Sequence, residues 1–96
     1  MKPIPINPET EEIARRVVWF ESPEEALAEP LRFMAYAMAG AAPEDMGILR
    51  RYVDDADFLE ALEKAPPGII GRRSWDYWNL QMGRCPVPPM PKREFR

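Results

Sequence analysis

The chain has 96 residues, with 12 Pro, 10 aromatic residues, one Cys and no His, and this length supports one small domain with one shared core. Its 13 basic and 16 acidic residues give a net charge of −3, which is ordinary for a soluble protein and unlike a general nucleic-acid binder. Residues 1–63 carry 6 basic and 14 acidic side chains, whereas residues 64–96 carry 7 and 2. We therefore expect an acidic body that ends in a basic tail.

The sequence contains no targeting or membrane pattern that we recognise. Its first eight residues lack the apolar run that a secretory signal requires. The longest apolar stretch, residues 33–43, is far shorter than the roughly 20 residues that cross a bilayer. A single cysteine, Cys85, forms no internal disulfide and is compatible with a reducing compartment. We expect a cytoplasmic protein without a membrane segment.

The first two predicted helices begin at capping residues followed by proline. Asn7 is a good helix cap, and the apolar residues after it have helical spacing, which predicts a helix over residues 8–20. Ser22 and Glu25 have the reciprocal spacing of a capping box and predict the start of a second helix. Pro30 lacks an amide hydrogen, so this helix should stop or kink just before it.

Four further helices follow in the same way. The nearly uncharged residues 31–42 predict a buried helix. Pro43 opens a helix whose apolar positions extend to Val53, and Asp54 caps the next one. Ser74 is expected to cap a last helix, which a glycine then ends.

These segments predict an all-α fold, a compact bundle of five or six short helices with an extended proline-rich C-terminal tail. Residues 1–84 form the single helical domain, and residues 85–96 form a proline-rich basic tail that packs on the domain or on a partner.

Catalytic chemistry has little support. The absence of histidine removes the commonest proton shuttle near neutral pH. The three aliphatic hydroxyls fall at or near predicted helix starts, where capping explains them. We therefore predict neither an enzyme nor a bound cofactor.

Asp54, Asp55 and Asp57, with or without Asp45, could supply oxygen ligands for Mg²⁺ or Ca²⁺. Helix-start electrostatics already explain the first three, so capping is favoured over a metal site. Cys85 has no neighbouring Cys or His, which excludes the usual zinc spacing. A partly buried anchor of the tail is favoured over a reactive thiolate at this position.

The richest local feature is the segment 71–79, in which two arginines precede three large aromatic residues. Such a set can bind phosphate and stack bases, but Trp75 and Trp78 share one helical face, so packing in the core is favoured.

The tail segment 88–93 matches a proline-rich ligand with a flanking basic residue. Two interpretations of the tail remain open: it is such a ligand, or it folds back across Trp75 or Trp78.

Several segments together resemble small uncharacterised bacterial proteins encoded near nucleotidyltransferase-like toxins. The resemblance covers about half of the chain and implies a partner protein, in the manner of an antitoxin, rather than an enzyme. It assigns no functional residue. The segments that carry it are Arg50-Arg51-Tyr52, Ala65 to Ile70, Arg73 to Leu80 and Pro86 to Pro91.

The leading hypothesis is a non-catalytic protein-interaction module whose partner is another protein, such as a nucleotidyltransferase-like toxin, or a second copy of the chain. The alternative is a small nucleic-acid-binding protein that uses arginine pairs near helix ends, which the acidic body disfavours. A metal-dependent enzyme at the aspartates ranks last. The expected partner-binding residues are Arg72, Arg73, Trp75, Trp78, Met90, Lys92 and Arg93, and the alternative uses Arg50, Arg51, Arg72 and Arg73.

Overall fold

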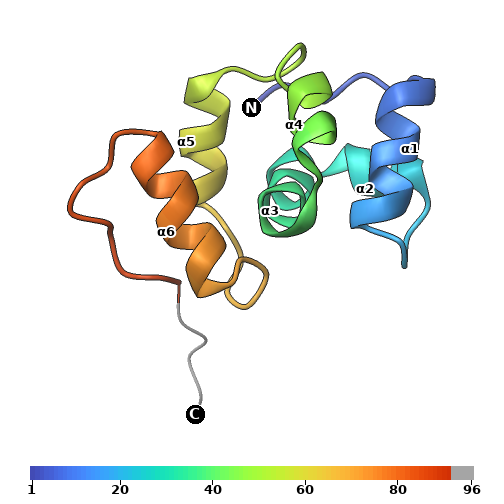
Figure 1. Cartoon of the computed structure of the whole chain (residues 1–96). Coiled ribbons are helices and arrows are strands. Elements are labelled where there is room, and N and C mark those ends of the chain that lie inside the picture. The colour runs from blue at the N-terminus through green and yellow to red at the C-terminus, as the bar shows by residue number, and fades with distance from the viewer. Residues whose placement is uncertain (92–96) are drawn as a thin grey trace.

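A computed structural model describes residues 1–91. Within this range the chain forms six helices and no strand, so the all-α prediction is confirmed (Figure 1). No helix in the described range is both long and apolar enough to cross a membrane. The helices are α1 (Pro8–Val17), α2 (Pro23–Ala28), α3 (Pro30–Gly40), α4 (Pro43–Leu49), α5 (Asp55–Glu63) and α6 (Arg72–Gln81).

Proline opens each of the first four helices. It occupies the first helical position, where its fixed φ suits the helix and its missing N–H has no intrahelical acceptor to lose. Two helices add a complete capping box: Asn7 with Thr10 at α1, and Asp54 with Asp57 at α5. These local signals divide the chain into short helices and leave tight connections between them.

Helix α3 lies at the centre of the molecule and contacts α1, α2, α5 and α6 (Figure 1). Five of its eleven residues are buried, which agrees with the prediction of a buried helix here. Phe58 of α5 and Ile13 of α1 are fully buried in the same core. A single cluster of buried apolar residues therefore joins the N-terminal helices to the C-terminal ones.

The first helix is shorter than predicted. It ends at Val17, and a turn over residues 18–21 follows, closed by the Glu21 amide donating to the Val18 carbonyl at 3.2 Å. Arg32 of α3 forms an ion pair with Glu21 and holds this turn against α3. Because of this tertiary contact, Trp19 and Phe20 leave the helix although the apolar spacing of the sequence would continue it.

The last helix begins earlier than predicted. Gly71 is its first capping residue, in extended conformation, and Ser74 lies inside the helix rather than at its cap. The additional turn brings Arg72 within 3.4 Å of Asp76, an (i, i+4) ion pair. At the other end Gly83 has φ +76°, and the amides of Gly83 and Arg84 close the helix end.

Two smaller differences concern α2 and α4. Only half of the predicted capping box forms at α2, because the hydroxyl of Ser22 accepts from the Glu25 amide at 3.3 Å without the reciprocal bond. Helix α4 ends at Leu49, and Val53 is buried just after the following turn rather than in the helix. The extended backbone that Asp54 needs as the cap of α5 requires a break here.

Candidate functional site

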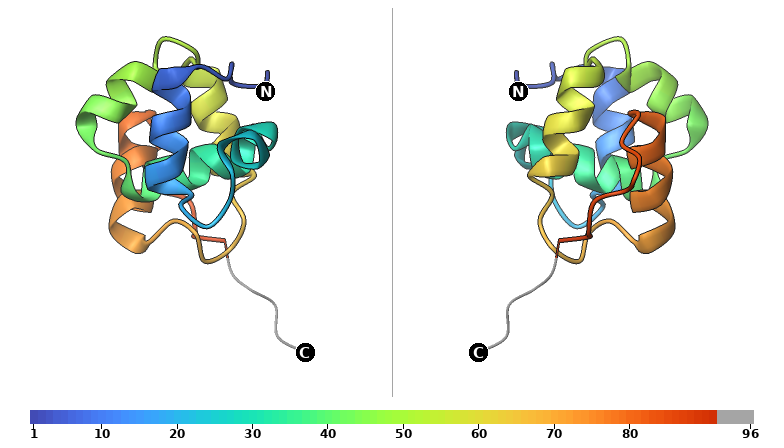
Figure 2. Two further views of the ribbon diagram at one scale, coloured as in Figure 1. Left: turned by 90° about the vertical axis from the view of Figure 1, so that its right-hand side faces the viewer. Right: turned by 90° about the vertical axis from the view of Figure 1, so that its left-hand side faces the viewer.

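Trp75 connects α6 to the tail. Its side chain is 4% exposed, and its indole Nε1–H donates to the Pro88 carbonyl oxygen at 2.8 Å. The segment after α6 runs back along the helix (Figure 2), and Met90 packs partly buried against the core. The described part of the tail therefore covers Trp75, as in the second of the two interpretations of the tail.

Trp78 is fixed from two sides. It stacks on Phe58 with the ring centroids 5.4 Å apart, and its indole Nε1–H donates to the Met38 carbonyl oxygen at 2.9 Å. Tyr77 meets it edge to face at 5.0 Å and is 55% exposed. The pair thus offers one immobilised ring and one exposed ring at the same place on α6.

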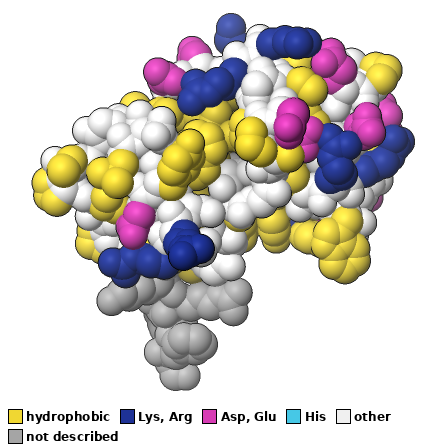
Figure 3. Space-filling model, in the orientation of Figure 1, with side chains coloured by type: hydrophobic (Ala, Val, Ile, Leu, Met, Phe, Trp, Pro, Cys, Tyr) yellow, Lys and Arg dark blue, Asp and Glu magenta, His cyan; other side chains and the backbone are white. Residues whose placement is uncertain are grey.

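A groove of about 510 Å³ lies beside these rings, between α6 on one side and α4 with the end of α3 on the other. We call it the α4–α6 groove. Figure 3 shows hydrophobic side chains exposed across the middle of the same face. The groove is lined by Met38, Ala39, Gly40, Ala41, Pro43, Met46, Gly47, Arg50, Ser74, Tyr77, Trp78 and Gln81.

Gly47 is the least expected residue in this groove. It lies inside α4, where glycine costs roughly 0.5 to 1 kcal/mol relative to alanine. A Cβ atom built on it would meet no atom within 4 Å, and the residue is exposed. Nothing in the described structure therefore requires a glycine here, and its small size leaves the groove wall open.

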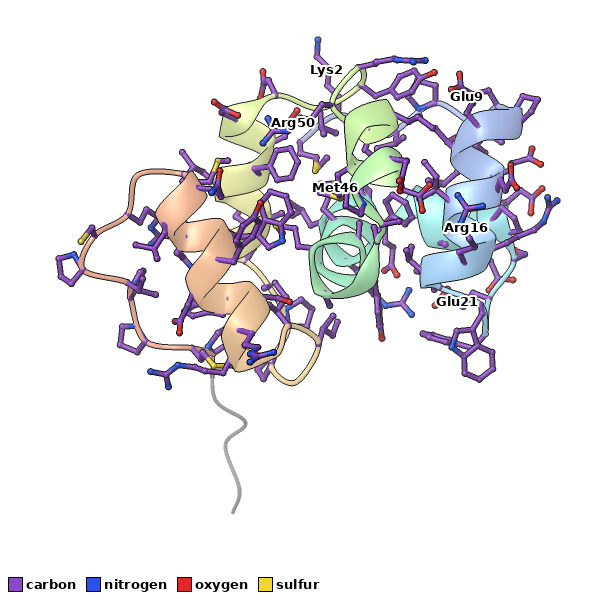
Figure 4. The ribbon with its side chains drawn as sticks, viewed as in Figure 1. Lys2, Glu9, Arg16, Glu21, Met46 and Arg50 are labelled. Atoms are coloured by element: carbon purple, nitrogen blue, oxygen red, sulfur yellow. The ribbon has the colours of Figure 1, made fainter. Side chains whose placement is uncertain are left out.

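The arginines of the nucleic-acid alternative are mostly engaged. Arg50 lies over the Phe58 ring at 4.7 Å and contacts Asp55 at 3.2 Å, reaching from α4 toward α5 (Figure 4). Arg51 forms an ion pair with Glu9 at 3.2 Å. Arg72 forms the ion pair with Asp76 described above. Arg73 is exposed. The predicted partner-binding residues Lys92 and Arg93 lie outside the described residues.

The aspartates are used by the fold. Asp54 and Asp57 exchange capping hydrogen bonds at 2.9 and 3.0 Å. Asp45 does not join them, because its buried carboxylate pairs with Arg16 of α1 at 2.5 Å, and this contact raises the pKa of the Arg16 guanidinium. Residues 1–91 contain no cluster of three or more potential metal ligands.

Cys85 is exposed, so the expectation of a partly buried anchor is wrong. The backbone carbonyl of Pro88, rather than the thiol, contacts Trp75.

A second aromatic feature was missed by the sequence analysis. The turn over residues 18–21, which we call the aromatic turn, carries Trp19 and Phe20 at its tip, 77% and 48% exposed. Phe20 meets both Trp19 and Tyr36 edge to face, at 5.6 and 5.5 Å. The helical spacing of the apolar residues placed Phe20 inside the predicted helix over residues 8–20, whereas α1 ends at Val17.

Electrostatic contacts hold the aromatic turn in place. Both terminal nitrogens of Arg32 bond to the two carboxylate oxygens of Glu21, and the guanidinium also lies 5.5 Å from the centre of the Tyr36 ring. The hydrogen bonds from Arg32 lower the pKa of Glu21, and those to Glu21 raise the pKa of Arg32. The turn is thereby anchored to α3 by a bidentate ion pair.

No protein-family model, curated protein or solved structure matches this chain. The α4–α6 groove offers apolar side chains, an open glycine and an exposed tyrosine, together with the polar side chains of Arg50, Ser74 and Gln81. This combination suits contact with another macromolecule by surface burial.

Proposed function

We propose that the protein is a non-catalytic interaction module that binds a partner protein in the α4–α6 groove. The observation that carries this proposal is Gly47, a glycine inside a helix that faces open space. No contact in the described structure offsets the helix stability that is lost by having glycine rather than alanine at position 47. A partner that approaches the backbone of α4 closely would supply that compensation, because a larger side chain would hold it away.

The aromatic wall supports the same proposal. Tyrosine, tryptophan and arginine are the residue types that most often dominate binding energy at interfaces, and the groove contains Tyr77, Trp78 and Arg50. Trp78 is held by a hydrogen bond and a stacked ring before any partner arrives. A partner therefore loses little entropy of this side chain on binding.

The side-chain inventory supports a non-catalytic role. The chain contains no histidine. Two of its three aliphatic hydroxyls serve helix starts: Thr10 accepts from the Asn7 amide, and Ser22 accepts from the Glu25 amide. Ser74 lines the groove, but no lysine, histidine or carboxylate lines it beside Ser74 to act as a base.

The partner class follows from charge and resemblance. Arg50, Arg51 and Arg72 already contact carboxylates, which favours a protein over nucleic acid as the partner. The resemblance to proteins encoded near nucleotidyltransferase-like toxins makes such a toxin the first candidate. In that role the protein would act as an antitoxin-like partner.

Site-specific photo-crosslinking in the native host tests the proposal. A photoreactive amino acid is placed at position 47 in one variant and at exposed Ala56 of α5 in a second. We expect position 47 to give a discrete crosslinked product containing a second protein, and position 56 to give none. No product from position 47, or the same products from both positions, would contradict the proposal.

The recovered partner is then tested with purified proteins. Gly47→Leu should fold, because the new side chain enters open space, and it should weaken binding at least about tenfold by occupying the groove. Ala56→Leu is the matched control and should bind as the unaltered protein does. Salt-sensitive binding of duplex DNA, with the same affinity in both variants, would instead favour the nucleic-acid alternative.

A further inference from the structure

The aromatic turn has the wrong residues for an ordinary surface turn. Tips of turns favour Gly, Pro, Asn, Asp and Ser, whereas Trp19 and Phe20 stand at the two tip positions between Val18 and Glu21. Trp19 is the most exposed large hydrophobic residue of the described chain. Its contact with Phe20 buries little of it, so the fold gains little from a tryptophan at this position.

The turn is also rigidly placed. Arg32 binds both carboxylate oxygens of Glu21 and contacts Glu29 at 3.2 Å, which joins the turn and the end of α2 to α3. Phe20 rests against Tyr36 from the same helix. The exposed Trp19 ring is therefore presented in a defined position before any binding, which reduces the entropy cost of using it.

The surroundings of this ring are acidic. Residues 18–29 contain four Glu and no Lys or Arg, and the two arginines just before them, Arg15 and Arg16, already pair with Glu11, Glu12 and Asp45. Glu21 and Glu29 pair with Arg32, whereas Glu24 and Glu25, both exposed, have no ion-pair partner among the described residues. Such a charge repels the phosphates of nucleic acid and of anionic lipid, and it attracts Lys and Arg side chains.

We propose that the aromatic turn is a second binding surface, which takes a basic segment of a partner protein. An Arg or Lys side chain would lie over the Trp19 ring, the aromatic surface that binds cations best. Glu24 and Glu25 would contact neighbouring basic residues of the same segment. Glu21 is labelled in Figure 4 at the end of the molecule away from α5 and α6, so this surface is separate from the α4–α6 groove.

Titration of the full chain with an amidated hexa-arginine peptide tests this proposal. The chain has three tryptophans, and the NMR signals of their indole N–H groups report the two surfaces separately: Trp19 the aromatic turn and Trp78 the groove. We expect the Trp19 signal to shift saturably at about 50 mM salt, and less at about 300 mM, while the Trp78 signal stays unchanged. Trp19→Phe assigns the signal.

Variants separate specific binding from general attraction. Trp19→Ala should weaken the peptide's affinity about threefold to tenfold, and Glu24→Gln with Glu25→Gln should weaken it several-fold. Glu44→Gln with Glu63→Gln removes the same charge from exposed, unpaired glutamates elsewhere in the described structure and should leave the affinity unchanged.

Four outcomes would overturn the proposal. The first is a Trp19 signal that the peptide does not move, and the second is an equal loss of affinity in both double variants. The third is a shift caused by phosphatidylglycerol vesicles but not by the peptide, which would indicate a membrane surface. The fourth is a shift on raising the protein concentration alone, which would indicate the basic segment of a second copy.

Discussion

Trp75 and Trp19 illustrate two regions of the molecule that use the same side chain in opposite ways. Around α6 and the tail, the indole of Trp75 is 4% exposed and its N–H is bonded to the chain. At the aromatic turn, Trp19 is 77% exposed beside an anchored ion pair. The first region buries its tryptophan in the folded structure, whereas the second leaves its tryptophan exposed to solvent. Exposure and hydrogen bonding, rather than residue type, therefore distinguish the tryptophan that is committed to the fold from the one that is left exposed.

The largest effect should follow from removing Trp75. Trp75→Ala is expected to lower the free energy of unfolding by about 3–5 kcal/mol, because it leaves a cavity between α6 and the tail. Trp75→Phe should keep most of the packing but lose the hydrogen bond to Pro88. The loss of that bond alone should lower the free energy of unfolding by about 1 kcal/mol, and the smaller ring should add to this loss. Denaturant unfolding measures both. A loss below about 1 kcal/mol for Trp75→Ala would show that this region is not committed to the fold.

A smaller effect is expected at the start of α5, which packs against the same core. Asp54→Ala removes the capping bond to the Asp57 amide and should cost about 0.5–2 kcal/mol, whereas Asp54→Asn should retain most of it. Adding Mg²⁺ should leave the melting temperature of the unaltered protein unchanged if capping is the role of these carboxylates. A saturable rise in melting temperature that Asp54→Asn abolishes would instead support a metal site.

At the aromatic turn the expected effect depends on pH. Because Arg32 lowers the pKa of Glu21 below its ordinary value of 4.5, the ion pair stabilises the fold above that value and its contribution is lost as the pH falls through the lowered pKa. The stability difference between the unaltered protein and Glu21→Gln should therefore be greatest near neutral pH and shrink below pH 4.5. Glu24→Gln, whose carboxylate has no ion-pair partner in the described range, serves as the control. A difference that grows on acidification would contradict this account.

The smallest effect on stability should come from Trp19 itself. Trp19→Ala removes a mostly exposed ring and is expected to change the free energy of unfolding by no more than about 0.5 kcal/mol. The same chemical denaturation that measures Trp75→Ala gives this value directly. A loss as large as that of Trp75→Ala would remove the distinction between the two regions.

Local signals predicted most of the fold. Helix starts at Asn7, Pro43 and Asp54 follow from caps and prolines that act within a few residues, and the structure contains each of them. The error at the end of α1 arose where a distant residue decides. Arg32 anchors the turn that ends α1, eleven residues after Glu21, and no local pattern encodes this contact.

The candidate site was predictable only in part. The spacing of Trp75 and Trp78 indicated one helical face, but it did not show that the tail covers Trp75 while Trp78 borders a groove. The groove depends on how α4 and α6 pack around α3, and a sequence contains no direct record of such packing. Gly47 carries no turn or cap signal, so its position beside open space in the groove wall could be seen only in the structure.

The most direct test of the groove compares stability and binding in one variant, Gly47→Ala. A methyl group at this position enters open space in a helix, so the free energy of unfolding should rise by about 0.5–1 kcal/mol. If the groove binds a partner at close approach, the same variant should bind the crosslinked partner more weakly than the unaltered protein does. A variant that gains stability and keeps full affinity would show that the partner does not use this groove.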